Sequence, residues 1–62
     1  MFLSHEHAVR HAHMLWRFTR DRRHTLVERQ RIGDQLRDVL REEQIAWSEI
    51  LKYDKSLKKG LR

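Results

Sequence analysis

A chain of 62 residues forms one small domain at most, and a chain this short buries only ~60% of its unfolded surface, so its stability needs support beyond one hydrophobic core. Since the sequence has no cysteine, disulfides and thiolate zinc sites are excluded, and self-association is the usual remaining support. Hydrophobic residues at 39%, charged residues at 37% and a net charge of +5 favour an exposed amphipathic helical protein with an anionic partner over a disordered tail.

The first predicted helix covers residues 4–31. Its apolar residues fall on one stripe when each residue advances the helix by ~100°. The stripe comprises Ala8, Val9, Ala12, Leu15, Trp16, Thr19, Leu26 and Val27. Ser4 stands where an N-cap accepts from exposed backbone N–H groups, and Glu6 suits the positive first turn. We therefore expect one long amphipathic helix that begins beside Ser4.

A second helix is predicted over residues 35–58, after a turn at residues 32–34. Its apolar stripe comprises Leu36, Val39, Leu40, Ala46, Trp47, Ile50, Leu51, Tyr53 and Leu57. In the connecting "RIGD", Gly33 tolerates the left-handed conformation that ends a helix, and Asp34 can cap the next one. The sequence thus predicts an all-α fold, an antiparallel two-helix hairpin that spans the 62 residues as one domain.

A chain reversal at Gly33 also sets which residues face each other across the hairpin. Each stripe has one charged residue near its middle, Arg23 on the first and Glu43 on the second, and the register places them opposite one another. We expect a partly buried ion pair between them, in which loss of one partner costs roughly 3–5 kcal/mol when the pair is truly buried.

A different division of the chain remains open. "TLVE", residues 25–28, has the S/T-x-x-E form of a capping box and follows the polar run "RDRRH". On this reading a shorter helix ends at about Arg20, and another begins at Thr25 and continues through Gly33.

Two hairpins together bury apolar surface that one hairpin leaves exposed. We therefore expect a homodimer that forms a left-handed, coiled-coil-like four-helix bundle. In length, hairpin plan and basic first helix, this architecture resembles the Rop family of plasmid RNA-binding proteins. The resemblance is architectural, with no match residue by residue, so it assigns no functional residue.

Four of the five histidines lie within "SHEHAVRHAH", residues 4–13. His7 and His11 are four residues apart and share a helix face, but two imidazoles do not complete a zinc site, and Asp54 is the sole placed candidate for a third ligand. Glu6 precedes the pair, whereas the zincin motif has its glutamate directly after the first histidine. The sequence predicts neither a metal site nor another cofactor, and we expect the histidines to face water or a partner.

No enzyme motif is present. The chain lacks a glycine-rich phosphate loop and a supported nucleophile and base pair, and a hairpin of this size does not readily enclose a catalytic pocket. A DNA-binding helix-turn-helix centred on Gly33 fails because it buries Glu28, Arg29 and Asp34. We therefore expect a binding protein rather than an enzyme.

Arginines give the first half of the chain its positive charge. Seven of them lie in residues 1–31 against three acidic residues. The planar guanidinium donates two parallel hydrogen bonds to a phosphate. The candidate phosphate ligands are Arg10, Arg17, Arg20 and Arg31, with Arg22 and Arg29 at the margins. This pattern indicates a small regulatory nucleic-acid-binding protein for RNA or DNA, of the type that phages and plasmids encode.

Met14 and Phe18 lie off the apolar stripe, between the basic residues and the histidines. Phe18 in a basic face can stack on a base, or both residues can form a contact with a second copy or with another protein. The alternative function is therefore a protein-binding inhibitor, adaptor or assembly subunit that docks a helix face on a larger partner. No apolar run approaches the ~18 residues of a membrane span, and "MFLSH" lacks the features of a signal peptide, so we expect a cytoplasmic protein.

Overall fold

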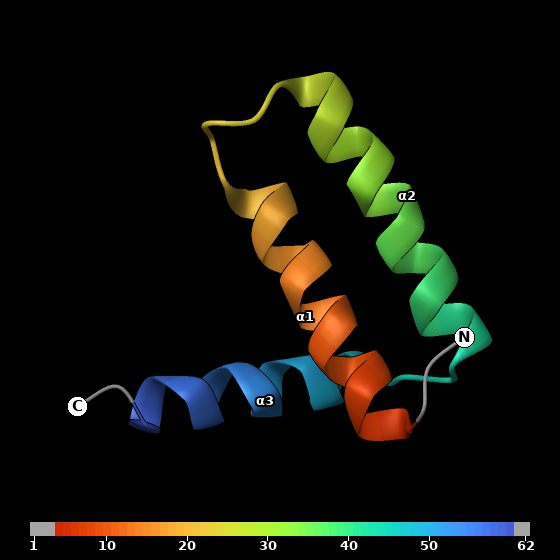
Figure 1. The fold of residues 1–62 in the computed structure, drawn as a ribbon, viewed down its shortest axis with the longest axis vertical. Helices are drawn as coiled ribbons and strands as arrows, with labels where there is room; N and C mark the ends of the chain where they lie inside the picture. The colour runs from red at the N-terminus through yellow and green to blue at the C-terminus, as the bar shows by residue number, and fades with distance from the viewer. Residues whose placement is uncertain (1–3, 61–62) are drawn as a thin grey trace.

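The computed structural model describes residues 4–60, which form three α-helices and no strand. Helix α1 covers His5–Arg20, α2 covers Leu26–Glu42 and α3 covers Trp47–Gly60. Figure 1 shows α1 and α2 side by side and antiparallel, diverging toward the loop that joins them, while α3 crosses the lower part of α1 at a steep angle. The molecule is flat, 31 × 30 × 18 Å, and α3 projects away from α2.

The expected start of the first helix is confirmed, but its expected end is wrong. Ser4 Oγ accepts from the backbone N–H of His7 at 3.2 Å and caps α1. The helix ends at Arg20 rather than residue 31, because the Asp21 carboxylate accepts from the backbone N–H of Arg23 at 3.0 Å and bends the chain into a short loop.

The capping box considered for the alternative division of the chain is present. Thr25 Oγ1 accepts from the backbone N–H of Glu28 at 3.2 Å, and a Glu28 carboxylate oxygen accepts from the backbone N–H of Thr25 at 3.4 Å. These reciprocal bonds satisfy two N–H groups that a helix N-terminus leaves unpaired. The chain therefore reverses before Thr25, not at Gly33.

The predicted turn at residues 32–34 is wrong, because all three residues lie inside α2. Gly33 does not have a positive φ. Ile32 and Leu36 on either side of it both pack into the core, so the helix continues through the glycine at a cost of only ~1 kcal/mol. The predicted hairpin with its turn at Gly33, and the register that this turn sets, therefore do not form.

The apolar pattern predicts one continuous helix over residues 35–58, but the chain turns at residues 43–46 and separates α2 from α3. Gln44 has φ 53°, the left-handed conformation. The backbone N–H of Ile45 bonds to the carbonyl of Leu40 at 2.9 Å, and that of Gln44 bonds to the carbonyl of Arg41 at 3.3 Å. This pair of bonds is the Schellman motif, and Ile45, which is buried, adds the apolar contact that usually accompanies it.

The core lies where α1 meets both other helices. Its buried apolar residues are Ala8, Val9, Ala12, Leu15, Leu36, Ile45 and Ile50, with Trp16, Ile32, Val39, Leu40 and Tyr53 packed against them. The N-terminal part of the first predicted stripe is thus confirmed, but Leu26 and Val27 are 74% and 64% exposed, because α2 begins where it diverges from α1. The four-helix bundle was inferred from two paired hairpins, but the described chain has three helices and no such hairpin. The homodimer stays a prediction.

Candidate functional site

The inner corner between α1 and α3 holds a positively charged hollow. The second half of each helix diverges from the crossing point, and side chains from both helices line a cleft of about 630 Å³ between them. We call it the basic cleft. Its lining residues are His13, Arg17, Arg20, Asp54, Ser56, Leu57 and Lys58.

Asp54, the carboxylate in the lining of the basic cleft, is already engaged. Its Oδ1 lies 2.9 Å from His13 Nε2, and its Oδ2 lies 3.3 Å from Lys58 Nζ. The hydrogen bond from His13, with a smaller contribution from Lys58, lowers the pKa of the Asp54 carboxyl below its usual value. Because the ionised carboxylate can only accept, His13 Nε2 donates. The negative charge of Asp54 is therefore balanced at the floor of the cleft and does not repel an anion there.

His13 itself is buried, which corrects the prediction that the histidines face water or a partner. Tyr53 meets its ring edge-on at a centroid distance of 5.0 Å, and Trp16 does so at 5.8 Å. A polar side chain enclosed by two aromatic rings is stable only when its nitrogen has a partner, and Asp54 is that partner. The pair fixes α3 against α1 and so sets the shape of the cleft.

Two arginines in the last turn of α1 supply the exposed cations of the cleft. The Arg20 guanidinium lies 4.8 Å from the centroid of the Trp16 ring, a cation–π contact that holds it along the cleft wall. Arg17 forms no ion pair with a carboxylate of residues 4–60. The guanidinium of Arg17 is therefore available to an anionic ligand.

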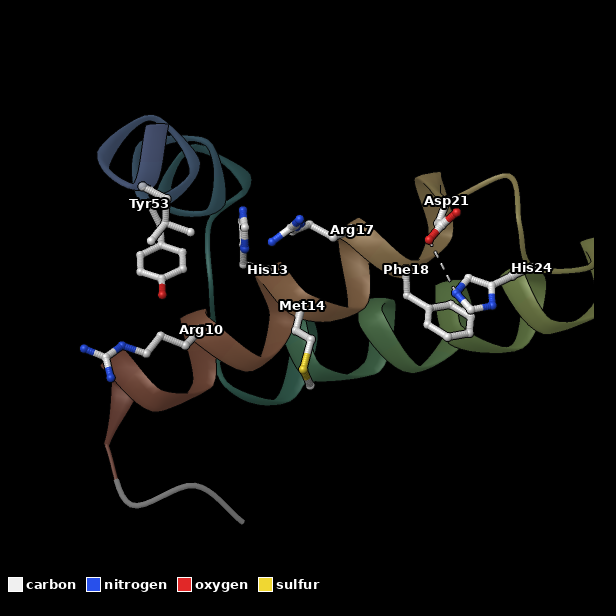
Figure 2. A pocket seen from close by; sticks show the side chains of 9 residues that line it. Arg10, His13, Met14, Arg17, Phe18, Asp21, His24 and Tyr53 are labelled. Carbon is white, nitrogen blue, oxygen red and sulfur yellow. Dashed lines mark ion pairs between the residues drawn. The ribbon is translucent and has the colours of Figure 1, made fainter. Parts of the chain in front are cut away.

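A second hollow, of about 390 Å³, adjoins the basic cleft and is lined by α1, by the loop after it and by α3. We call it the aromatic groove, and it shares His13, Arg17 and Leu57 with the cleft. Figure 2 shows Arg10 and the Tyr53 hydroxyl near one end, Phe18 and His24 at the other, and Met14 between them. The groove is therefore polar at one end and aromatic at the other.

The aromatic end is built by the last turn of α1 and the loop that follows it. The rings of Phe18 and His24 stack with centroids 3.6 Å apart and planes 12° apart. Beside them, Asp21 accepts from Arg23 Nη2 at 2.9 Å and from Arg23 Nε at 3.1 Å, and these bonds lower the pKa of Asp21 to about 2. Asp21, like Asp54, is thus ionised with its charge already paired.

The structure divides the six predicted phosphate-binding arginines into two groups. Arg10, Arg17 and Arg20 line the two connected hollows, although Arg10 also pairs with Glu6 at 3.0 Å. The other three lie apart: Arg22 is in the loop before α2, and Arg29 and Arg31 are on α2. Arg29 lines a different groove between α1 and α2, and its Nε is buried without a hydrogen-bond partner.

The predicted ion pair between Arg23 and Glu43 does not form. Arg23 is in the loop before α2, where its side chain is 89% exposed and pairs with Asp21 at 2.9 Å. Glu43 caps the opposite end of the 17-residue helix α2. The prediction paired these residues because it assumed a hairpin that turns at Gly33. The chain turns before Thr25 instead, so the two residues do not face each other.

The histidine cluster does not converge on a metal site. Among residues 4–60, no group of three or more His, Asp or Glu side chains is arranged to hold a metal ion. His7 Nδ1 lies 2.8 Å from Ser4 Oγ, and Asp54, the proposed third ligand, is bonded to His13 instead. His5 Nε2 lies 2.9 Å from Glu49 on α3, so this histidine joins two helices.

Sequence reasoning missed Lys58 and His24 as site residues. Lys58 stands four residues after Asp54 on α3, a spacing that predicts the observed ion pair but not its position against α1. The contribution of His24 depends on the loop at residues 21–25, which only the alternative division of the chain contained.

No protein-family model matches the chain, and searches of curated proteins and of solved structures give no significant match. Within residues 4–60, no helix is long and apolar enough to cross a membrane.

Proposed function

We propose that this protein binds nucleic acid by holding backbone phosphates in the basic cleft. The observation that carries the proposal is the convergence of Arg17, Arg20 and Lys58, from two helices, on one hollow whose lining holds a single carboxylate, Asp54, so that positive charge remains in excess even with Lys58 paired to it. A phosphate that enters meets guanidinium groups without an unpaired negative charge nearby. The role that fits such a small binding protein is regulatory, in the cytoplasm.

Arginine suits this role for reasons of shape and solvation. Its planar fork donates two parallel hydrogen bonds to phosphate oxygens, and it loses less hydration than an ammonium group on binding. The cation–π contact with Trp16 positions Arg20 before a ligand arrives, which reduces the entropy lost on binding. Three phosphate contacts give a plot of log K against the logarithm of the salt concentration a slope of about −2 to −3.

Alanine substitutions test the proposal by fluorescence anisotropy with a labelled oligonucleotide. Arg17→Ala, Arg20→Ala and Lys58→Ala should each weaken binding to all sequences similarly and reduce the salt slope by about one unit. Arg31→Ala and Arg37→Ala, at exposed positions on α2, are the matched controls because they remove the same charge away from the cleft.

The control variants should bind like the wild-type protein. If they weaken binding as much as the cleft variants do, the interaction reflects net charge alone and the proposal is wrong. If no cleft variant weakens binding, the phosphates are held elsewhere and the proposal is also wrong.

A second candidate function, a protein interface, is favoured by the exposed start of α2. Leu26 and Val27 lie together there with little cover, and neither lines the basic cleft. The accessible surface is 5472 Å², whereas a compact protein of 7.7 kDa has ~4,300 Å². The radius of gyration is 12.0 Å against ~10.6 Å for a compact chain of 62 residues.

This excess of surface supports the expected homodimer, since a standard interface buries ~800 Å² from each partner. Sedimentation equilibrium tests the candidate: the wild-type protein should be dimeric at micromolar concentration and Val27→Asp should be monomeric. A monomeric wild-type protein over the whole concentration range contradicts it.

A further inference from the structure

We propose that the aromatic groove holds an unpaired base, so that the ligand of this protein is single-stranded RNA or DNA rather than a duplex. The inference rests on the proposed function, because Arg17 belongs to both the groove and the basic cleft. One strand can therefore place a phosphate in the cleft and an adjacent base in the groove.

The stacked pair of Phe18 and His24 is the observation that points to a base. Both rings are half-buried and both line the groove, so part of the stacked pair faces its interior. Aromatic side chains in proteins that bind single strands stack on bases without reading the sequence, since every base has a π-face. The contact with His24 holds the Phe18 ring in one orientation before a base arrives.

The spacing along α1 matches a short strand. Arg17 directly precedes Phe18, and Arg10 lies eight residues, or ~12 Å of helix rise, before it. Because both arginines line the groove with Phe18, a strand that runs along α1 finds a cation on each side of Met14. The Tyr53 hydroxyl near Arg10 offers a further hydrogen bond to a sugar or phosphate.

A duplex does not fit this arrangement. The bases of a duplex are stacked on their neighbours, and a base reaches a pocket only after it leaves the stack, which costs a few kcal/mol. The groove, at about 390 Å³, has room for a base and its sugar but not for a double helix. The steep crossing of α3 over α1 further confines the ligand to one strand, since the cleft lies inside a corner.

The charges around the groove favour a polyanion. Asp21 is the carboxylate in its lining, and its charge is paired with Arg23 across bonds of 2.9–3.2 Å. Arg10 is likewise paired, with Glu6, so Arg17 is the cation that gives the groove its net positive charge. An acidic peptide offers the same negative charge but no flat ring for the Phe18 and His24 stack.

The test compares ligands and variants in one anisotropy assay. The ligands are a labelled single strand of mixed sequence, the same strand with its central base removed, the matching duplex and poly-glutamate. The single strand is prepared in ribose and deoxyribose forms. The protein variants are Phe18→Leu, which removes the ring, and Phe18→Trp, which keeps an aromatic face. Arg37→Ala is the control, because Arg37 is exposed on α2 and lines neither hollow.

The wild-type protein should bind the intact strand about 5-fold to 150-fold more tightly than the strand that lacks a base, the range measured for stacking on one aromatic side chain. It should bind the duplex and poly-glutamate more weakly. Phe18→Leu should bind the intact strand only as tightly as the wild-type protein binds the strand without the base. Phe18→Trp should restore the difference, and Arg37→Ala should leave it unchanged.

Removing the base from the ligand tests stacking without altering the fold. Equal affinity of the wild-type protein for the strands with and without the base overturns the inference, and so does equal affinity for the duplex or for poly-glutamate. If Arg17→Ala still weakens binding in that case, the phosphate site stands and only the stacking is refuted. If no nucleic acid binds, the proposed function itself fails. A preference between the two sugar forms then identifies RNA or DNA as the ligand.

Discussion

Replacing Gly33 with alanine distinguishes the three-helix fold from a hairpin that turns at this residue. In the structure Gly33 lies inside α2 without a positive φ, so its lack of a side chain serves no turn. A Cβ added there meets Thr19 Cγ2 at 3.9 Å, an ordinary van der Waals contact. Alanine stabilises a helix interior by about 0.8–1.0 kcal/mol relative to glycine, so Gly33→Ala should stabilise the protein by about 1 kcal/mol.

Circular dichroism at 222 nm, followed against temperature and urea, measures this change. For a domain of this size, 1 kcal/mol corresponds to a rise in Tm of about 4–8 °C. Gln44→Gly is the companion variant: Gln44 has φ 53°, and glycine adopts this conformation without strain, so the substitution should add about 0.5–1 kcal/mol. If the chain instead turned at Gly33 and ran as one helix through Gln44, both substitutions would destabilise the protein. A loss of stability in both variants therefore refutes the three-helix fold.

Three further predictions concern the packing and capping of the helices. Ile50→Ala should cost roughly 2–5 kcal/mol in urea unfolding, because Ile50 is a fully buried contact of α3 with the core; a cost below about 1 kcal/mol contradicts this. Thr25→Ala should cost about 1 kcal/mol by removing the cap of α2, whereas no loss of stability indicates that the helix runs through this position. The lowered pKa of Asp54 means that its bond with His13 stabilises the fold above the ordinary aspartate pKa of ~3.9, and this stabilisation is lost as the pH falls through the lowered pKa. The Tm of the wild-type protein should therefore fall below about pH 4 more steeply than that of Asp54→Asn, and parallel curves count against the pair.

The features that sequence reasoning placed correctly are set by local chemistry. The N-cap at Ser4 and the capping box at Thr25 depend on residues three apart, and both caps form. The start of the apolar stripe, from Ala8 to Leu15, depends on helical periodicity and is buried as expected. The apolar stripe through Thr19 and Leu26 predicts one continuous helix, whereas the capping box at Thr25 predicts a new helix start, and the capping box is what forms.

The two turns of the chain were harder to place, because the glycine that suggests a turn, Gly33, lies inside α2, and the turn after α2 has Gln44 where glycine is usual. Glycine is a residue type typical of turns, but a single glycine such as Gly33 destabilises a helix only slightly when residues on both sides of it pack into the core. Gln44 occupies the position where glycine usually ends a helix. Its left-handed conformation is stabilised by the burial of Ile45, a tertiary contact that no short sequence window contains.

The part of the candidate site that lies on α1 was predictable from the sequence, whereas the part that depends on tertiary contacts was not. Arg10, Arg17 and Arg20 were selected from their place on one helix face, and they do line the connected hollows. Asp54 was singled out as a candidate ligand beside His7 and His11, but it bonds to His13. The crossing angle of α3 brings Lys58 into the cleft, and that angle follows from a helix break that the sequence pattern did not indicate.

A nuclear magnetic resonance titration tests the central claim, that the corner between α1 and α3 is a phosphate-binding site. The backbone amide spectrum of the 15N-labelled protein is followed while a single-stranded oligonucleotide is added at near-physiological salt. We expect the largest shifts at the C-terminal half of α1 and around Lys58 on α3, with the middle of α2 around Asp38 unchanged. Shifts confined to α2, or no shifts at that salt concentration, contradict it.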